Sequence, residues 1–138
     1  MRTVIFHCRN YRTEVVELSD LPKNIKPEEI LENNQKQELS NCVVALVTVE
    51  SKDNPEVAKY LISETSKMAQ DVGTSSIVIL PFAHLSNDLA PSDLSLSVIK
   101  STVEGLKGFN VMQAHFGSHK ELLLDVYGHP RNVRYREF

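Results

Sequence analysis

The stretch CVVALVTV (residues 42–49) is a continuous run of apolar and β-branched side chains. Such a run is typical of a central β-strand that is buried on both faces. A second run of the same kind, SIVIL, occupies residues 76–80. The two runs therefore predict the core strands of a sheet.

The segment between these two strands predicts an amphipathic helix. Asn54 suits the N-cap, Pro55 the first helical position and Gly73 the C-terminal end. Apolar and small side chains recur between them at helical spacing. They are Val57, Ala58, Leu61, Ile62, Thr65, Met68, Ala69 and Val72.

A second helix is expected to start near Ser92 or Asp93 and to stop at Gly108, with Leu96, Ile99, Val103 and Leu106 on its buried face. Strands are then predicted at residues 110–116 and 122–127.

The N-terminal region predicts a hairpin. The runs TVIFHC (3–8) and TEVVEL (13–18) are separated by the polar RNYR. Residues 19–40 hold two prolines and many charges, so we expect a connector with one helical turn after Pro27. The resulting order is β-β-β-α-β-α-β-β. It predicts a single-domain α/β sandwich with a mixed sheet over residues 1–138.

Composition limits the class of protein. A chain of 138 residues can bury one core without a metal or disulfides. No apolar run approaches the roughly 20 residues of a membrane helix, and MRTVIFHCRNYR is unlike a signal peptide, so we expect a cytoplasmic protein without membrane contact. The only two cysteines, Cys8 and Cys42, lack CxxC spacing and are expected to be buried free thiols.

The charge pattern bears on nucleic-acid binding. A net charge of −3 argues against a broad basic surface. The tail HPRNVRYREF (129–138) is nevertheless locally basic, with Arg131, Arg134 and His129 as candidate tRNA contacts. The alternative is a solvated or frayed terminus.

Three polar corners follow predicted strands: PFAHLSND (81–88), HFGSHK (115–120) and YGHP (127–130). Ligands of open α/β sheets sit at the carboxyl ends of strands, so these corners are candidate sites. His84 and Lys120 are candidates for chemistry, against the alternatives of a buried histidine and a solvated loop lysine. His115 and His119 lack the further ligands of a metal site, so no metal or cofactor is expected.

These corners, with VVALVTVE (43–50) before the first helix, closely resemble the N-terminal editing domain of archaeal threonyl-tRNA synthetases. That family is related in fold to the D-aminoacyl-tRNA deacylases. PFAHLS, FGxxK and GHP carry the resemblance, which extends from Met1 to the GHP corner. It implies hydrolysis of L-serine wrongly esterified to threonine tRNA, while correctly charged threonyl-tRNA is spared. We expect the chain to be the N-terminal part of a longer synthetase or editing protein.

The resemblance also implies site residues. The family's catalytic lysine falls on Lys120 and its histidine on His84, and His119 is a rival catalytic candidate. The implied substrate-binding residues are Val49, Ala83 and Phe116, through their main chains, with Gly117, His7 and Glu50. The chain departs from the family where Ser118 and His119 replace frequent tyrosines, His115 a proline and Val133 a glutamate.

The implied partners are the 3′ end of seryl-tRNA(Thr), a catalytic threonyl-tRNA synthetase in cis or in trans, and a second copy of the chain in a homodimer. Two other functions stay open at this point. One is a D-aminoacyl-tRNA deacylase, which shares the fold and the ester chemistry. The other is a non-catalytic tRNA-docking module.

Overall fold

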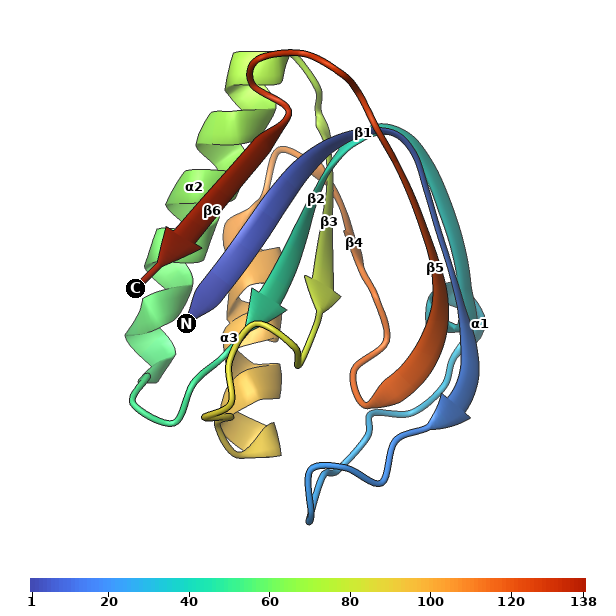
Figure 1. Cartoon of the computed structure of the whole chain (residues 1–138), viewed down its shortest axis with the longest axis vertical. Helices are drawn as coiled ribbons and strands as arrows, with labels where there is room; N and C mark the ends of the chain where they lie inside the picture. Colours follow the sequence, from blue (N-terminus) through green and yellow to red (C-terminus); the bar gives the residue numbers. More distant parts are fainter.

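A computed structural model describes Met1 to Phe138 as a six-stranded mixed sheet with helices packed on one face (Figure 1). Its elements are β1 (Arg2–Leu18), α1 (Glu32–Gln35), β2 (Lys36–Thr48), a 3₁₀ turn (Pro55–Val57), α2 (Ala58–Val72), β3 (Ser76–Pro81), α3 (Ser92–Gly105), β4 (Asn110–Gln113), β5 (Ser118–Val126) and β6 (Val133–Glu137). The strand order is β4-β3-β2-β1-β5, and β6 also pairs with β1. The predicted α/β class with a mixed sheet is confirmed.

The predicted N-terminal hairpin is wrong, because residues 2–18 form one continuous strand. Tyr11, in the middle of the polar RNYR, is fully buried and donates a hydrogen bond to Gln37 Oε1 (2.8 Å). Its neighbours Arg9 and Arg12 are exposed. RNYR therefore continues the alternation of a strand instead of turning.

The long strand β1 bends where its neighbour on one edge changes. It pairs with β2 from Arg2 to Glu14. On the other edge it pairs first with β6 and then, from Cys8 onward, with β5. The register of the β5 ladder shifts between Cys8 and Asn10, and such an irregularity bends a strand and increases its twist. The second half of β1 consequently curves away together with β5 (Figure 1).

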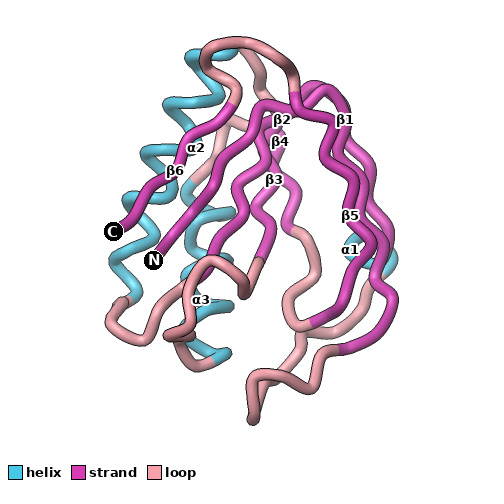
Figure 2. The backbone as a smooth tube through the Cα atoms, in the orientation of Figure 1, coloured by secondary structure: helices cyan, strands magenta, loops and turns pink.

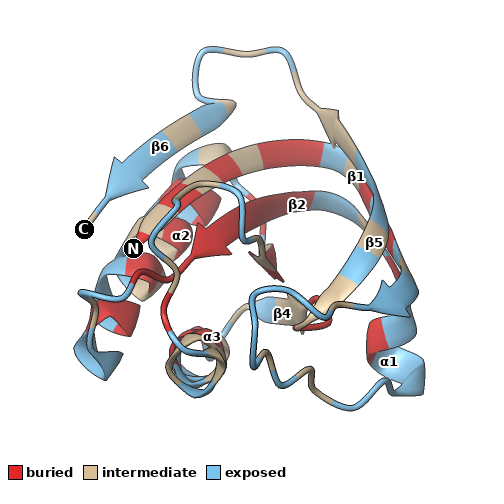
Figure 3. Ribbon diagram, turned by 60° about the horizontal axis from the view of Figure 1, so that its bottom comes forward, coloured by how far each residue is buried: buried red, intermediate tan, exposed pale blue.

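This curvature produces two separate cores. The larger lies between the sheet and the helices and includes Ile5, Ala45, Leu61 and Ile99. The smaller, which lies within the curved part of the sheet, contains Tyr11 with other buried residues. They are Cys8, Cys42, Val44, Leu46, Val78, Leu80 and Ala114. Figure 3 shows the buried residues concentrated along β1 and β2, and the expectation of buried free cysteines is confirmed.

Five other segments differ from the sequence-based expectation. The helical turn expected after Pro27 is instead the short α1, and residues 36–40 of the expected connector belong to β2 because they extend its ladder with β1. The tail forms β6, so the frayed terminus considered above is excluded. The second helix ends at Gly105 rather than at 108, β4 ends at Gln113, and β5 begins at Ser118.

Parallel pairing fixes where the loops gather. β2, β3 and β4 run parallel, so their carboxyl ends lie at the same end of the sheet. Figure 2 shows the loops after β3 and β4 and the arm after β1 at this same end of the molecule. None of the helices has the length and apolarity that crossing a membrane requires.

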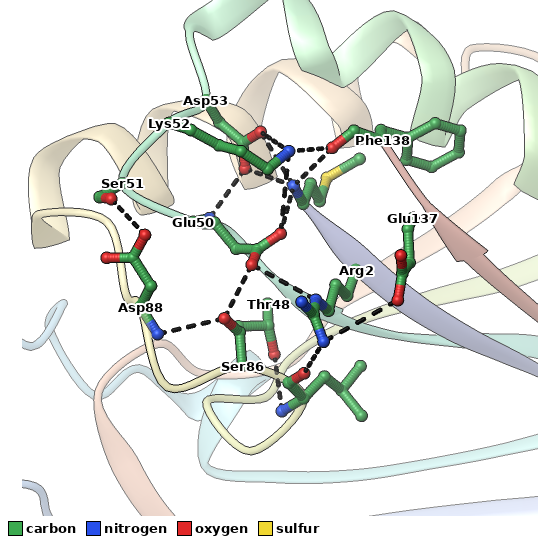
Figure 4. A network of polar contacts seen from close by, with 12 residues as sticks. Arg2, Thr48, Glu50, Ser51, Lys52, Asp53, Ser86, Asp88, Glu137 and Phe138 are labelled. Carbon is green, nitrogen blue, oxygen red and sulfur yellow. Dashed lines mark hydrogen bonds and ion pairs between the residues drawn. The ribbon is translucent and has the colours of Figure 1, made fainter.

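A buried ionic network lies just beyond β2 (Figure 4). The Met1 ammonium is buried and donates to Glu50 Oε1 (3.0 Å) and Asp53 Oδ1 (2.9 Å). Glu50 also pairs with Arg2 and accepts a hydrogen bond from Ser86 Oγ (2.8 Å). Burial raises the pKa of Glu50, but Ser86, the ammonium and Arg2 together outweigh it, so the net pKa is lowered.

Glu50→Gln should reduce the free energy of unfolding at pH 7 by about 1 to 3 kcal/mol, the usual contribution of hydrogen bonds to a charged group. Because the folded-state pKa of Glu50 is lowered, its contribution is complete above the ordinary glutamate pKa and is lost as the pH falls through the folded-state value. The gap between wild type and variant should therefore close at acidic pH. Denaturant titrations at pH 7, 5 and 3 measure this difference in the free energy of unfolding, with the exposed Glu56→Gln as control. A gap independent of pH would contradict the assignment.

Candidate active site

A cavity of about 600 Å³ opens at the C-terminal ends of β2 and β3. Its main lining segments are residues 47–49 at the end of β2, 80–84 at the end of β3, 116–120 at the start of β5, the arm after β1, and helix α3. The arm contributes Ser19, Leu21, Pro22 and Ile25, and α3 closes the far side with Ser92, Ser95 and Ile99. The cavity therefore depends on segments that are distant in sequence.

Most of the predicted site residues meet in this cavity. They are Val49, Ala83, His84, Phe116, Gly117, His119 and Lys120. The PFAHLS and HFGSHK corners thus face each other across the end of the sheet, as an active site built from both would require.

The other predicted residues do not line the cavity. Glu50 is committed to the network around Met1. His7 Nδ1 lies 2.8 Å from His129 Nε2, and His7 Nε2 lies 3.0 Å from Asn41 Oδ1. Their contacts show how these residues hold the fold together, and nothing in the structure brings them to the cavity.

The basic tail is likewise engaged with its neighbours. Arg134 forms an ion pair with Asp71 of α2 (2.5 Å), and the Arg131 N–H donates to His129 Nδ1 (3.1 Å). A role for Arg131, Arg134 and His129 in tRNA binding remains a prediction.

The turn at Phe116 and Gly117 is held by the arm. Gly117 has φ of +90°, and a Cβ there would lie only 2.6 Å from Pro27 Cα. The Phe116 N–H donates to Glu28 Oε1 (2.8 Å), and the Glu28 N–H donates to Phe116 O (3.1 Å). The main chain of Phe116, which the sequence predicted to hold substrate, is therefore already bonded to Glu28.

The two histidines of HFGSHK have different environments. His115 is fully buried, and its ring nitrogens contact Ser118 Oγ (2.7 Å) and Glu28 O (2.8 Å). His119 is exposed and lines the cavity. His115 thus fastens the corner to the arm, and His119 is the one that a ligand can reach.

Lys120 is the only lysine or arginine among the cavity-lining residues. Its Nζ donates to Ser118 O (3.1 Å). Burial lowers the pKa of Lys120 to about 8, and the negative charge of Glu28 partly counteracts this effect. The amine is therefore mostly protonated at neutral pH but titrates within reach of it.

The turn after β3 is fixed by a side chain that the sequence analysis did not single out. The Thr48 hydroxyl contacts Phe82 O and accepts from the Leu85 N–H (3.3 Å). Ala83 lies between these points, and its main-chain groups make no hydrogen bond within the chain. The exposed ring of His84 packs edge-on against Phe82, with the ring centroids 4.8 Å apart. This turn therefore lines the cavity with a residue whose main-chain N–H makes no hydrogen bond within the chain and with an imidazole.

Together these groups suit chemistry that develops negative charge on an oxygen. A desolvated ammonium and a fixed main-chain N–H stabilise such charge without reorganising. Thr48 and Glu28, which hold the two sides of the cavity, carried no local sequence signal. The contact of Glu28 with Phe116 joins positions 88 residues apart.

Comparison with known proteins shows what the chain is similar to. A family model described as the archaea-specific editing domain of threonyl-tRNA synthetase matches residues 1–138. The chain is similar to threonine–tRNA ligases from Staphylothermus marinus (33% identity, covering 94% of this chain and 21% of that protein) and Thermococcus sibiricus (39%, covering 76% and 18%). It thus spans about a fifth of the length of these relatives.

A solved structure shares the fold. The chain superposes on the c-Myc DNA unwinding element binding protein with a TM-score of 0.71, covering 100% of this chain and 99% of that one. The sequence identity is 11%, so this likeness concerns the fold alone.

Lys120→Met should raise the free energy of unfolding at pH 7 by about 1 to 3 kcal/mol, because each unit by which burial lowers the lysine pKa corresponds to about 1.4 kcal/mol. The folded-state pKa is below the unfolded one, so the gain should shrink as the pH rises from about 8 to 10.5. Denaturant titrations at pH 7 and 10 test this, with exposed Lys107→Met as the matched control. A loss of stability at pH 7 would contradict it.

Proposed function

Because this chain belongs to the archaea-specific editing-domain family of threonyl-tRNA synthetase, we propose that it hydrolyses the ester bond of L-seryl-tRNA(Thr) and spares threonyl-tRNA(Thr). The observation that supports this best is the cavity that Lys120 lines together with Ala83, whose main-chain groups make no hydrogen bond within the chain. Both belong to the motifs, FGxxK and PFAHLS, on which the sequence resemblance depends.

The proposed reaction uses water as the nucleophile. Water adds to the ester carbonyl, and negative charge collects on the carbonyl oxygen. The bond to the tRNA ribose oxygen then breaks, and that oxygen takes up the proton lost by the water, which gives free serine and tRNA. The terminal 2′-OH of the tRNA positions or activates the water. No protein nucleophile is required, so the catalytic contribution of the chain is positioning and electrostatic stabilisation.

Lys120 supplies the charge in this scheme. Its ammonium stabilises the developing oxyanion more than the neutral ester, which is the condition for lowering the barrier. The main-chain N–H of Ala83 adds a fixed dipole on the opposite wall. His84 and His119 line the same cavity and order the substrate there.

Selectivity follows from the nature of the walls. Serine lacks one methyl group of threonine, and a synthetic site can reject the smaller amino acid by only about 1 to 3 kcal/mol. A second site that admits serine and excludes threonine corrects the error. Main-chain walls at Ala83 and Phe116 suit this role because hydrogen bonds to Thr48 and Glu28 hold the segments in place.

The proposed reaction also implies binding partners. The chain would act on the 3′ end of seryl-tRNA(Thr) in the cytoplasm, next to a catalytic threonyl-tRNA synthetase joined in cis or acting in trans. It would do so as a homodimer.

The protein should release serine from seryl-tRNA(Thr) about 10- to 200-fold faster than threonine from threonyl-tRNA(Thr), the range that one methyl group provides. Release of radiolabelled amino acid from each ester measures this, with D-seryl-tRNA as a third substrate. Equal rates for the two L-esters would refute proofreading. Preference for the D-ester would indicate a D-aminoacyl-tRNA deacylase, and no turnover of any ester would indicate a docking module.

Lys120→Met should lower the rate by about 100- to 1,000-fold, the usual cost of losing one preorganised electrostatic donor. His84→Ala and His119→Ala should cost less. Because the cation is present below the pKa of Lys120 and lost above it, the wild-type rate should fall as the pH rises through about 8. Single-turnover rates from pH 6 to 9 measure both effects.

The rival assignment makes the opposite forecast. If His119→Ala abolished turnover while Lys120→Met stayed within about tenfold, a difference of about 1.4 kcal/mol, His119 would be the general base and Lys120 a binding residue.

A further inference from the structure

We propose that Glu28 is a positioning residue of the hydrolytic site: from the arm after β1, its carboxylate fixes the Phe116 corner and supplies a negative charge behind the cavity wall that carries Lys120. This inference rests on the proposed function for its catalytic meaning. The contacts and charges that carry it belong to the chain itself.

The Glu28 carboxylate contacts both the connection between β4 and β5 and helix α3. Oε1 accepts from the Phe116 N–H (2.8 Å) and from Gln113 Nε2 (2.7 Å). Oε2 forms an ion pair with Lys100 Nζ of α3 (3.2 Å). The side chain is only 13% exposed. A carboxylate in this position is engaged on every side by protein donors.

The main chain of Glu28 adds two more contacts to the same corner. Its N–H donates to Phe116 O (3.1 Å), and its carbonyl oxygen lies 2.8 Å from His115 Nε2. Glu28 therefore joins the arm to the corner by three contacts, and a fourth reaches Gln113 at the end of β4. Since Phe116 and Lys120 both line the cavity, Glu28 orders the wall on which the catalytic ammonium is mounted.

Glu28 does not itself line the cavity, so it acts through its neighbours rather than on the substrate. Its hydrogen bond also occupies the Phe116 N–H. The corner thus presents a fixed wall, and an N–H without a hydrogen-bond partner in the chain is found instead at Ala83, in the turn after β3. This division explains why an arm that carries no catalytic side chain is packed across the site.

The electrostatic role follows from what surrounds Lys120. Burial lowers the pKa of the ammonium, and Glu28 is the carboxylate that raises it, with a net value of about 8. His84 and His119 face the same cavity. In the β1–β5 ladder, Lys120 lies opposite Val15.

The nearest carboxylates of the β1–β5 ladder belong to the pairs of residues on either side of Val15 and Lys120. Glu14 is opposite Glu121, and Glu17 is opposite His119. Lys100, on α3, balances part of the charge of Glu28. Glu28 is therefore the group whose removal should change the charge state of Lys120.

Glu28→Gln tests the charge while keeping an oxygen that can accept from Phe116. In ¹³C-lysine NMR titrations, with Lys120 assigned from the Lys120→Met spectrum, the midpoint should fall below the wild-type value. Lys100→Met removes a competing cation and leaves the bond to Phe116 intact, so its midpoint should rise. Glu29→Gln, an exposed neighbour on the same arm, should leave it unchanged.

The rates give a second readout. If the midpoint of Glu28→Gln falls by about one unit from about 8, the seryl-tRNA rate should drop by about threefold at pH 7.5 and stay nearly unchanged at pH 6. A purely structural role would instead give the same loss at both pH values, and that result would overturn the proposal.

The titration separates this inference from the proposed function, because it needs no substrate. Equal Lys120 titration midpoints in wild type, Glu28→Gln and Lys100→Met would overturn the role of Glu28, even if the protein hydrolyses seryl-tRNA as proposed. Midpoints that diverge as expected would support the electrostatic role even if seryl-tRNA were not the substrate. Lys100→Met keeps the test decisive if Glu28→Gln fails to fold.

Discussion

The pairing of β1 with three other strands is the constraint on which the rest of the structure depends. One edge of β1 is held by β2, and the other is shared between β6 and β5, with the register shift near Cys8 at the change of neighbour. Because the strand bends there, β5 is carried round to the end of the parallel strands. Lys120, near the start of β5, consequently reaches the turn that follows β3, and two motifs far apart in sequence form one cavity.

Local sequence patterns predicted the elements whose burial can be recognised from the spacing of their own apolar side chains. The runs at 42–49 and 76–80 and the helix between Asn54 and Gly73 needed only periodicity and capping signals. The continuity of β1 depended instead on a partner: Tyr11 stays buried because Gln37 satisfies its hydroxyl. β6 was missed for a similar reason, since an alternating charged tail becomes a strand only when another strand offers an unpaired edge.

The candidate site divides in the same way. Lys120, His84 and the main-chain walls followed from motifs that keep their spacing along the chain, whereas Glu28 and Thr48 act through long-range contacts that leave no local pattern. The resemblance also suggested His7 and Glu50, which the structure places in hydrogen-bond networks away from the cavity. Chemistry was thus easier to locate from sequence than the supports that hold it.

The glycine at the corner links two segments in a way that matters for any change to the site. A side chain at Gly117 would collide with the main chain of Pro27 rather than with a movable side-chain tip. The arm and the corner therefore cannot vary independently: a side chain at position 117 requires the arm to move, and the φ of +90° leaves the backbone strained even then. Position 117 is therefore closed to most mutational paths, and a library of the corner should keep this glycine while it varies the other positions.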